Sequence, residues 1–146
     1  IKGVDVVLQG LWKFGNDWVF DSRLSYTYQK AQDFTDKSDK DTYGGQISYI
    51  PWHSGSAILN AGYKSWELNY SFIYTGERYD VSANTPENYR LPWYTSDFSL
   101  AKKFSWRKYD FKLTLEVNNI FNQQYEVVRS YPMPGTNFKF ILNLTI

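Results

Sequence analysis

Hydrophobic and polar residues alternate along most of the chain with a period of two, which predicts β-strands. Seven such runs cover residues 4–14, 18–28, 43–63, 66–74, 94–104, 109–117 and 138–146. The third run is interrupted around Pro51 and Gly55, and we interpret it as one long interrupted strand. An eighth strand hidden in this run, with a turn at residues 51–55, is the alternative. All the runs are nine residues or longer, whereas soluble strands average about 5–6 residues and tilted strands that cross a bilayer need about 9–11.

The two faces of these predicted strands differ in chemistry. One face is aliphatic and aromatic, and within the runs it carries one charge, Lys102, near a strand end where a long side chain can reach the membrane surface. The opposite face is predicted to be hydrophilic throughout and holds Asp21, Arg23, Asn60, Glu67, Asn69, Asp97, Lys108, Asp110, Lys112, Glu116 and Asn143. This pattern is typical of a strand between lipid on one side and a wet lumen on the other.

The connections alternate in length. Short ones at 15–17, 64–65 and 105–106 separate long ones at 31–54, 80–90 and 119–135. Transmembrane barrels place tight turns on the periplasmic side and long loops on the outer side, with aromatic girdles at the interfaces. Rings gather here at the short turns: Trp12, Phe14, Trp18, Phe20, Tyr63, Trp66, Phe104 and Trp106. These features predict an antiparallel transmembrane β-sheet.

A self-contained small β-barrel that binds a ligand, soluble and lipocalin-like, is the alternative, because its strands also alternate but turn their apolar face inward. Reagents for lipid-exposed side chains distinguish the two, since they label Leu113 and Leu142 only in the membrane protein. Seven antiparallel strands do not close a barrel, because bacterial single-chain barrels have an even number and open edges in lipid are costly. The chain also starts inside a patterned stretch, without a signal peptide. We therefore expect the C-terminal part of a longer chain.

Composition narrows the function further. The chain has no Cys and a single His, His53, which excludes thiolate chemistry and multi-His metal sites. The net charge of +1 does not suggest the concentrated basic face that binds nucleic acid. No apolar run approaches the roughly 20 residues of a membrane-spanning helix. We find no catalytic constellation and predict neither an enzyme nor a bound metal or cofactor. An outer-membrane protease is disfavoured because its acidic and His groups are not assembled.

Local sequence strings resemble a known family. Residues 117–126 read VNNIFNQQYE, residues 131–135 read YPMPG, and an alternating run follows to the terminus. Upstream, residues 50–53 read IPWH, residues 74–79 read YTGERY, and residues 91–94 read LPWY before Asp97. Together these strings resemble the C-terminal end of TonB-dependent outer-membrane receptors, over essentially the whole chain.

The resemblance implies that residues 1–146 are the last seven strands of a 22-stranded barrel. It places the protein in the bacterial outer membrane, in contact with lipid, and implies three further parts outside this chain: upstream strands, a plug domain and a TonB box through which TonB acts. Such receptors import scarce large nutrients. The ending is most similar to receptors for cobalamin, with iron–siderophore and haem receptors close behind.

Candidate ligand contacts lie in the long loops, where aromatic rings give contact area and amides give directional hydrogen bonds. We select Tyr79, Asn84, Asn88, Tyr89, Arg129 and Tyr131. The acidic residues Asp33, Asp36, Asp39 and Asp41 suggest a cation cluster, but the lysines between them favour a solvated loop. His53 is either an axial ligand of haem or, as we favour, a packing residue. Residues 118–121 are predicted to shape the end of a strand.

Overall fold

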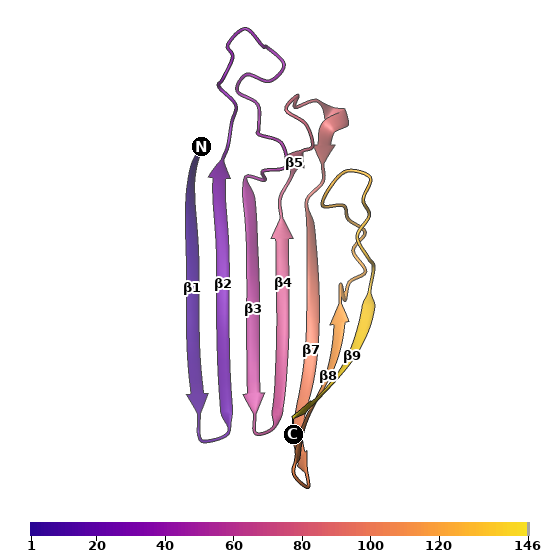
Figure 1. Cartoon of the computed structure of the whole chain (residues 1–146). Coiled ribbons are helices and arrows are strands. Elements are labelled where there is room, and N and C mark those ends of the chain that lie inside the picture. The colour runs from indigo at the N-terminus through magenta and orange to yellow at the C-terminus, as the bar shows by residue number, and fades with distance from the viewer. Residues whose placement is uncertain (146) are drawn as a thin grey trace.

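The structure is a computed structural model that describes residues 1–145, and it consists of one long antiparallel sheet with three loops at one end (Figure 1). Neighbouring strands follow one another in the chain. Their bounds are β1 Lys2–Phe14, β2 Trp18–Lys30, β3 His53–Tyr63, β4 Trp66–Thr75, β7 Trp93–Trp106, β8 Tyr109–Asn118 and β9 Asn137–Thr145. A small second sheet pairs β5 Arg78–Tyr79 with β6 Tyr89–Arg90, next to the 3-10 helix η1 Pro86–Asn88. The seven predicted strands are confirmed, and Ile146, the last residue of the seventh run, lies outside the described residues.

The prediction for residues 43–63 is wrong in its first half. Residues 43–52 form no strand and contribute one isolated bridge, Gln32 to Gln46, so β3 begins only at His53. Tyr49 has a positive φ of 59°, which strand geometry does not allow, and Pro51 has no N–H for a ladder. These residues are therefore loop, and no eighth strand lies within them.

The third short turn lies two residues later than predicted. Trp106 pairs with Tyr109, so Ser105 and Trp106 belong to β7 and the turn is at 107–108. Arg107 takes a positive φ of 58° there, as Lys64 does at 52° in the turn between β3 and β4. Lys108 consequently lies in the turn and not on the polar face of a strand. The turn at 15–17 is confirmed, with Gly15 at a φ of 60°.

The register keeps the apolar positions of all seven strands on one side of the sheet. Directly opposed residues of antiparallel strands point to the same side, and Leu24, for example, opposes Leu8 on one neighbour and Ala57 on the other. This side is uncovered: Phe138 is 76% exposed and Phe140 is 66% exposed. The only buried hydrophobic residues in the described chain are Ala31 and Ala101. The apolar side chains therefore form an outer surface and not an internal core.

Lysines lie at both ends of this apolar face. Lys102 is close to the short-turn end, where its Nζ donates a hydrogen bond to Ser65 Oγ at 2.6 Å and lies 4.4 Å from the centroid of the Trp66 ring. The expectation that Lys102 is the only charge on this face is wrong. β1 and β2 extend two residues beyond the predicted runs, which places Lys2 opposite Lys30 at the loop end of the same face.

The polar face carries a hydrogen-bonded network. Asn69 donates to Asn60 at 2.5 Å, and Asn60 donates to Asp21 at 3.0 Å. Glu67 accepts hydrogen bonds from both Lys103 and Lys112, and these side chains lie near a hollow of about 510 Å³. The face is not hydrophilic throughout, as the sequence led us to expect, because aliphatic side chains interrupt it: Val7, Leu11, Val19, Ile58, Ile73 and Ile141.

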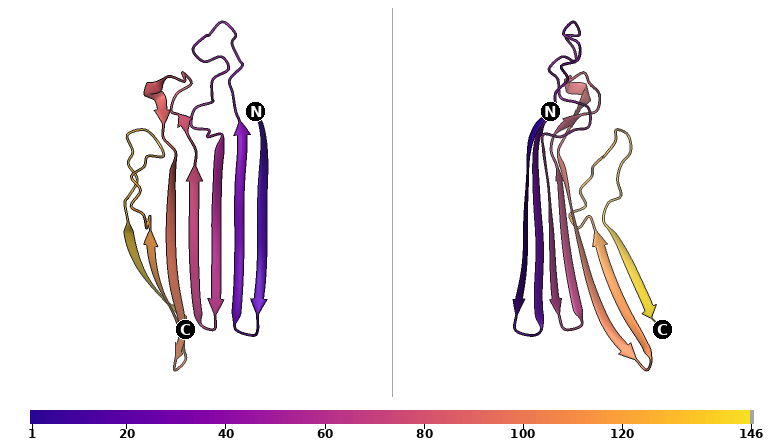
Figure 2. Two further views of the ribbon diagram at one scale, coloured as in Figure 1. Left: turned by 180° about the vertical axis from the view of Figure 1, so that it is seen from behind. Right: turned by 60° about the vertical axis from the view of Figure 1, so that its left-hand side comes forward.

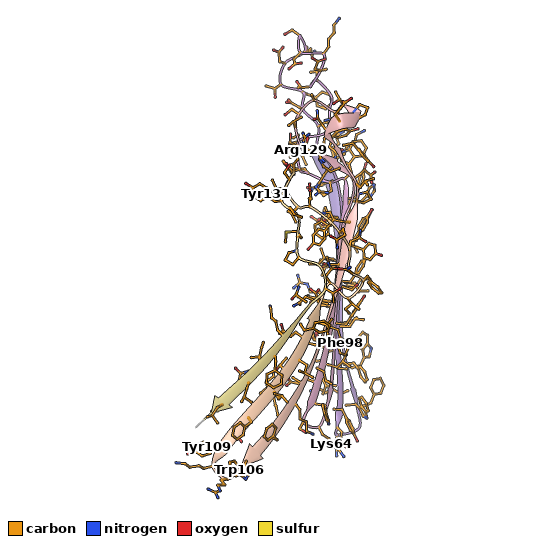
Figure 3. All side chains as sticks on the ribbon, turned by 90° about the vertical axis from the view of Figure 1, so that its right-hand side faces the viewer. Lys64, Phe98, Trp106, Tyr109, Arg129 and Tyr131 are labelled. Atoms are coloured by element: carbon orange, nitrogen blue, oxygen red, sulfur yellow. The ribbon has the colours of Figure 1, made fainter. Side chains whose placement is uncertain are left out.

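Aromatic rings gather near the short turns, as predicted. Trp18 stacks on Tyr63 with ring centroids 4.3 Å apart, and Phe104 stacks on Phe111 at 5.1 Å. Figure 3 places Lys64, Trp106 and Tyr109 at this end, Phe98 further along the sheet, and Arg129 and Tyr131 in the loops at the opposite end. The two ends thus differ, with tight aromatic-flanked turns at one and long loops at the other.

The sheet curves but stays open. In Figure 2, strands β7, β8 and β9 lean away from the plane of β1 to β4. Strands β1 and β9 are the two edges and do not pair with each other in the described part of the chain. Residues 1–145 therefore do not form the closed small barrel that the lipocalin-like alternative requires. None of the described helical segments has the length and hydropathy needed to span a membrane.

The uncovered apolar face predicts contact with lipid. In a bilayer, we expect a membrane-soluble carbene reagent to label Leu113 and Leu142, which oppose each other on β8 and β9, and to spare their polar-face neighbours Lys112 and Asn143. The measurement is mass spectrometry of the digested protein after photolysis in membranes. Labelling of Asn143 at the level of Leu142 would contradict the assignment of faces.

Candidate ligand-binding loops

Three loops gather at the end of the sheet opposite the short turns: residues 31–52, 76–92 and 119–136 (Figure 1). They connect β2 to β3, β4 to β7 and β8 to β9, so their ends are fixed by the strand order. Since the loops begin and end on neighbouring strands, side chains that are distant in the sequence can contact one another here. The contacts described below hold the three loops together.

Asn119 organises the base of the third loop. It is buried, has a positive φ of 51°, and its backbone N–H donates to Asp97 Oδ1 at 2.7 Å. Its side-chain amide donates to the carbonyls of Gln123 at 3.0 Å and Pro134 at 3.1 Å. One asparagine therefore ends β8 and ties both arms of the loop. The prediction that residues 118–121 shape a strand end is confirmed.

Arg78 joins the second loop to the third. Its guanidinium is buried, and Nη2 donates to the carbonyl oxygens of Glu126 at 2.8 Å and Val127 at 3.2 Å. This burial lowers the pKa of Arg78 from its ordinary value, although an arginine remains charged at neutral pH. Beside this contact, Trp93, the first residue of β7, stacks on Tyr125 of the third loop, with ring centroids 4.5 Å apart. The Arg78 hydrogen bonds therefore hold the second and third loops against each other.

Asp80 is a buried carboxylate between two arginines. Its side chain is 1% exposed, and Oδ2 accepts hydrogen bonds from Arg90 Nε at 2.8 Å and Nη2 at 2.5 Å. Arg129 approaches the same oxygen at 3.5 Å from the third loop and is half-exposed. Asp80 Oδ1 has no hydrogen-bond partner among the described residues. The Asp80 carboxylate thus links the end of β5 to Arg90 of β6. Through Arg129 it also reinforces the contact between the second and third loops.

Hydrogen bonds also connect the first loop to the second. The Asn84 amide group accepts from the backbone N–H of Gln46 and donates to the Gln46 carbonyl at 3.1 Å. The Tyr49 N–H donates to the carbonyl of Tyr79 at 2.8 Å. Gln46 itself is buried and donates to the Ile50 carbonyl at 2.7 Å. All three loops are therefore linked by polar contacts.

Three of the six predicted ligand contacts lie together. Tyr79, Asn84 and Tyr89 line a pocket of about 370 Å³ between the first two loops, with Gln46, Trp52 and Glu77 among its other residues. Tyr79 and Tyr89 meet edge to face at 5.7 Å. Tyr89 also lines a second pocket of about 490 Å³, shared with Trp93, Gln124 and Tyr125. Rings and amides with a carboxylate are suited to a large polar ligand.

The other three predicted residues lie elsewhere in the loops. The Asn88 amide donates to the Ala83 carbonyl at 2.9 Å and to Thr85 Oγ1 at 3.0 Å. Arg129 contacts Asp80, as described above, and Tyr131 is 71% exposed. None of the three lines either of these two pockets.

Burial raises the pKa of the Tyr89 and Tyr125 phenols above the ordinary value of tyrosine. Both hydroxyls therefore stay protonated at neutral pH and can donate a hydrogen bond. In the first loop, the pKa values of Asp33, Asp36 and Asp39 are lowered mainly by hydrogen bonds from the nearby residues Thr35, Ser38 and Thr42. Each of these aspartates thus caps its own turn.

The described residues contain no group of His, Asp and Glu side chains placed to hold a metal ion. His53 starts β3 on the apolar face, where its Nδ1 is 2.8 Å from the Tyr26 hydroxyl and its ring lies 5.1 Å from that of Tyr28. It packs between tyrosines and faces away from the polar side of the sheet, as the packing interpretation predicts.

Sequence reasoning missed Arg78, Asp80 and Arg90, although it selected Asn84 and Arg129, which also hold the loops together. Arg78 belongs to the YTGERY string that carries the family resemblance, but its partners, the carbonyls of Glu126 and Val127, have no side-chain signature. Asp80 and Arg90 lie ten residues apart in a polar stretch and become neighbours only through the β5–β6 pairing. The sequence signal that could have identified them was an arginine, Arg78, two residues before an aspartate, Asp80, near the end of a predicted strand.

The Arg78 contacts predict that the third loop loosens when this side chain is removed. We expect Arg78→Gln to weaken the closed state by roughly 2 kcal/mol, because two carbonyls lose a charged donor. Hydrogen exchange of amides in 119–136 would then be about 30-fold faster. Arg129→Gln should change exchange much less, since half-exposed ion pairs contribute at most about 1 kcal/mol. Arg107→Gln, in a short turn, is the matched control, and equal effects of all three variants would contradict this account.

Comparisons with known proteins agree with the open antiparallel sheet and its apolar outer face. No curated protein matched the chain. A family model described as TonB dependent receptor-like, beta-barrel matches residues 1–120, which include six of the seven strands and stop at the base of the third loop. This is a family of outer-membrane receptors that act as transporters, and the chain belongs to it.

Proposed function

We propose that residues 1–146 are the C-terminal barrel segment of a larger TonB-dependent receptor in the bacterial outer membrane. The upstream strands, the plug domain and a TonB box through which TonB acts would lie in the rest of that receptor. The two unpaired sheet edges support this proposal, because edge strands in lipid leave backbone N–H and C=O groups without partners. The segment contributes seven strands of wall, a polar lumen face and three outer loops.

We propose further that the receptor imports a scarce large nutrient, with cobalamin as the first candidate and iron–siderophore or haem as the others. The observation that carries this proposal is the joined loop cluster with its two pockets, which share Tyr89 and are lined by rings and amides. The VNNIFNQQYE string and the segment after it support the cobalamin assignment by resemblance. Haem receives less support, because His53 packs with Tyr26 on the apolar face.

In this proposal Tyr79, Asn84 and Tyr89 contact the ligand from the pocket between the first two loops. Tyr131, with its ring largely in solvent, and Arg129 would meet the ligand from the third loop. Asn88 would act by holding its loop, through its bonds to Ala83 and Thr85. In this role the loop residues would bind and release the nutrient, and they would catalyse no reaction.

The size of the native polypeptide tests the barrel-segment proposal. We expect an antibody against residues 119–137 to detect, in a denatured outer-membrane extract, one band several times heavier than 17.2 kDa. A heat-stable band near 17 kDa would instead support a small self-closing barrel. Two bands, one small and one large, would indicate a receptor cleaved in a loop but held by strand pairing.

Ligand binding tests the nutrient and the loop residues together. We expect the full receptor in outer-membrane preparations to bind one of three probes: cyanocobalamin, a ferric siderophore or haem. Tyr89→Ala and Tyr131→Ala should each weaken that binding roughly tenfold, as expected when an aromatic contact is lost. Tyr109→Ala, at the opposite end of the sheet, is the control and should leave affinity unchanged. Absence of binding to all three probes would contradict the nutrient classes, and full binding by both loop variants would contradict the contacts.

A further inference from the structure

The charges on the apolar face are all positive, and two of them oppose each other. Every Asp and Glu of the seven strands lies on the polar face within the described residues, whereas Lys2, Lys30 and Lys102 lie on the apolar one. Lys2 and Lys30 are cross-strand partners at the loop end of β1 and β2. Like charges in directly opposed positions repel each other, since their Cβ atoms are about 5 Å apart.

Nothing in the described chain neutralises this pair. None of the ion pairs within residues 1–145 includes Lys2 or Lys30. The nearest acidic strand residue in the sequence, Asp5, points to the other face, where it accepts a hydrogen bond from Thr27 at 2.6 Å. Lys102 differs, because its ammonium group donates a hydrogen bond to Ser65 Oγ at 2.6 Å. The opposed lysines therefore form a site that an anion would complete.

The surroundings of the pair indicate where that anion comes from. Lys30 Nζ lies 5.1 Å from the centroid of the Trp52 ring, and Tyr28, His53 and Tyr26 follow on the same face toward the middle of the sheet. Such a belt of rings marks the depth of a membrane interface, with lipid tails on one side and head groups on the other. Lysines just outside the belt lie at the level of lipid head groups.

We propose that Lys2 and Lys30 bind the phosphate of a membrane lipid, in the leaflet that surrounds the three loops. Two ammonium groups share one phosphate, while Trp52, Tyr28 and His53 contact the apolar and sugar-like parts of the same lipid. Lys2 and Lys30 line neither of the two loop pockets, whereas Trp52, the ring next to Lys30, also lines the pocket between the first two loops. It rests on the membrane placement in the proposed function and is independent of which nutrient is imported.

The test measures binding of a fluorescent diphosphoryl lipid A to the full receptor in detergent micelles. We expect the double variant Lys2→Gln/Lys30→Gln to bind it about 25-fold more weakly, which is about fivefold for each lysine removed near a lipid surface. Lys30→Arg, which keeps the charge, should bind nearly as wild type. Lys37→Gln, an equal loss of charge in the exposed first loop, is the control. Dephosphorylated lipid A should bind wild type and double variant equally weakly.

Two results would overturn the proposal. Equal binding of lipid A by wild type and double variant would mean that the lysines are neutralised by another part of the receptor, such as the strand that precedes β1. Competition by inorganic phosphate at the same phosphate concentration would mean that the site takes free phosphate and not lipid. Heat-shifted gel migration of each variant shows that the barrel is folded. Lipid binding without binding of any nutrient probe would contradict the nutrient proposal alone.

Discussion

The structure depends on one constraint. The apolar face of this single-layer sheet is not covered by the described chain, so an apolar medium outside the chain must surround it. A soluble domain of this length buries its large side chains in a core, but Ala31 and Ala101 are the only buried hydrophobic residues described here. The cross-strand register makes this face continuous, because a shift by one residue would move every ring to the polar side. Lipid is the solvent that suits such a face, and a tilted strand of about 9–11 residues spans it.

The same register fixes the chemistry of the other side and of both ends. Residues that alternate with the apolar ones form the Asp21–Asn60–Asn69 chain and the Glu67 ion pairs, which suit a wet lumen and would be costly in lipid. At the short-turn end, rings flank the turns and Lys102 bonds to Ser65. At the loop end, Lys2 and Lys30 remain without an anionic partner in the described chain. Each side and each end therefore follows from one pairing pattern.

Period-two alternation predicted the strands and their faces because this signal is local and repeats along each strand. It failed where local geometry overrides it. Residues 43–49 keep the parity of β3, but the positive φ of Tyr49 and the imino nitrogen of Pro51 prevent a ladder. The turn at 107–108 was predicted at 105–106 because the preceding run was ended at Phe104, whereas Ser105 and Trp106 still pair with Asp110 and Tyr109. The contacts of Arg78 with the Glu126 and Val127 carbonyls cross 48 and 49 residues to backbone atoms, and no sequence pattern records them.

In the proposed receptor, the contacts among the three loops would keep the ligand-binding surface in one defined arrangement. Ordering a free loop on binding costs conformational entropy, which subtracts from affinity, so a loop that is already held binds more tightly. Arg78 and Asp80 supply that order, since both are buried and link the second loop to the third, while Tyr89 and Tyr131 are exposed. The half-exposed Arg129 is the weaker part of this arrangement. Because its contact with Asp80 is long at 3.5 Å and open to solvent, it adds less to the link between these loops than the buried contacts of Arg78.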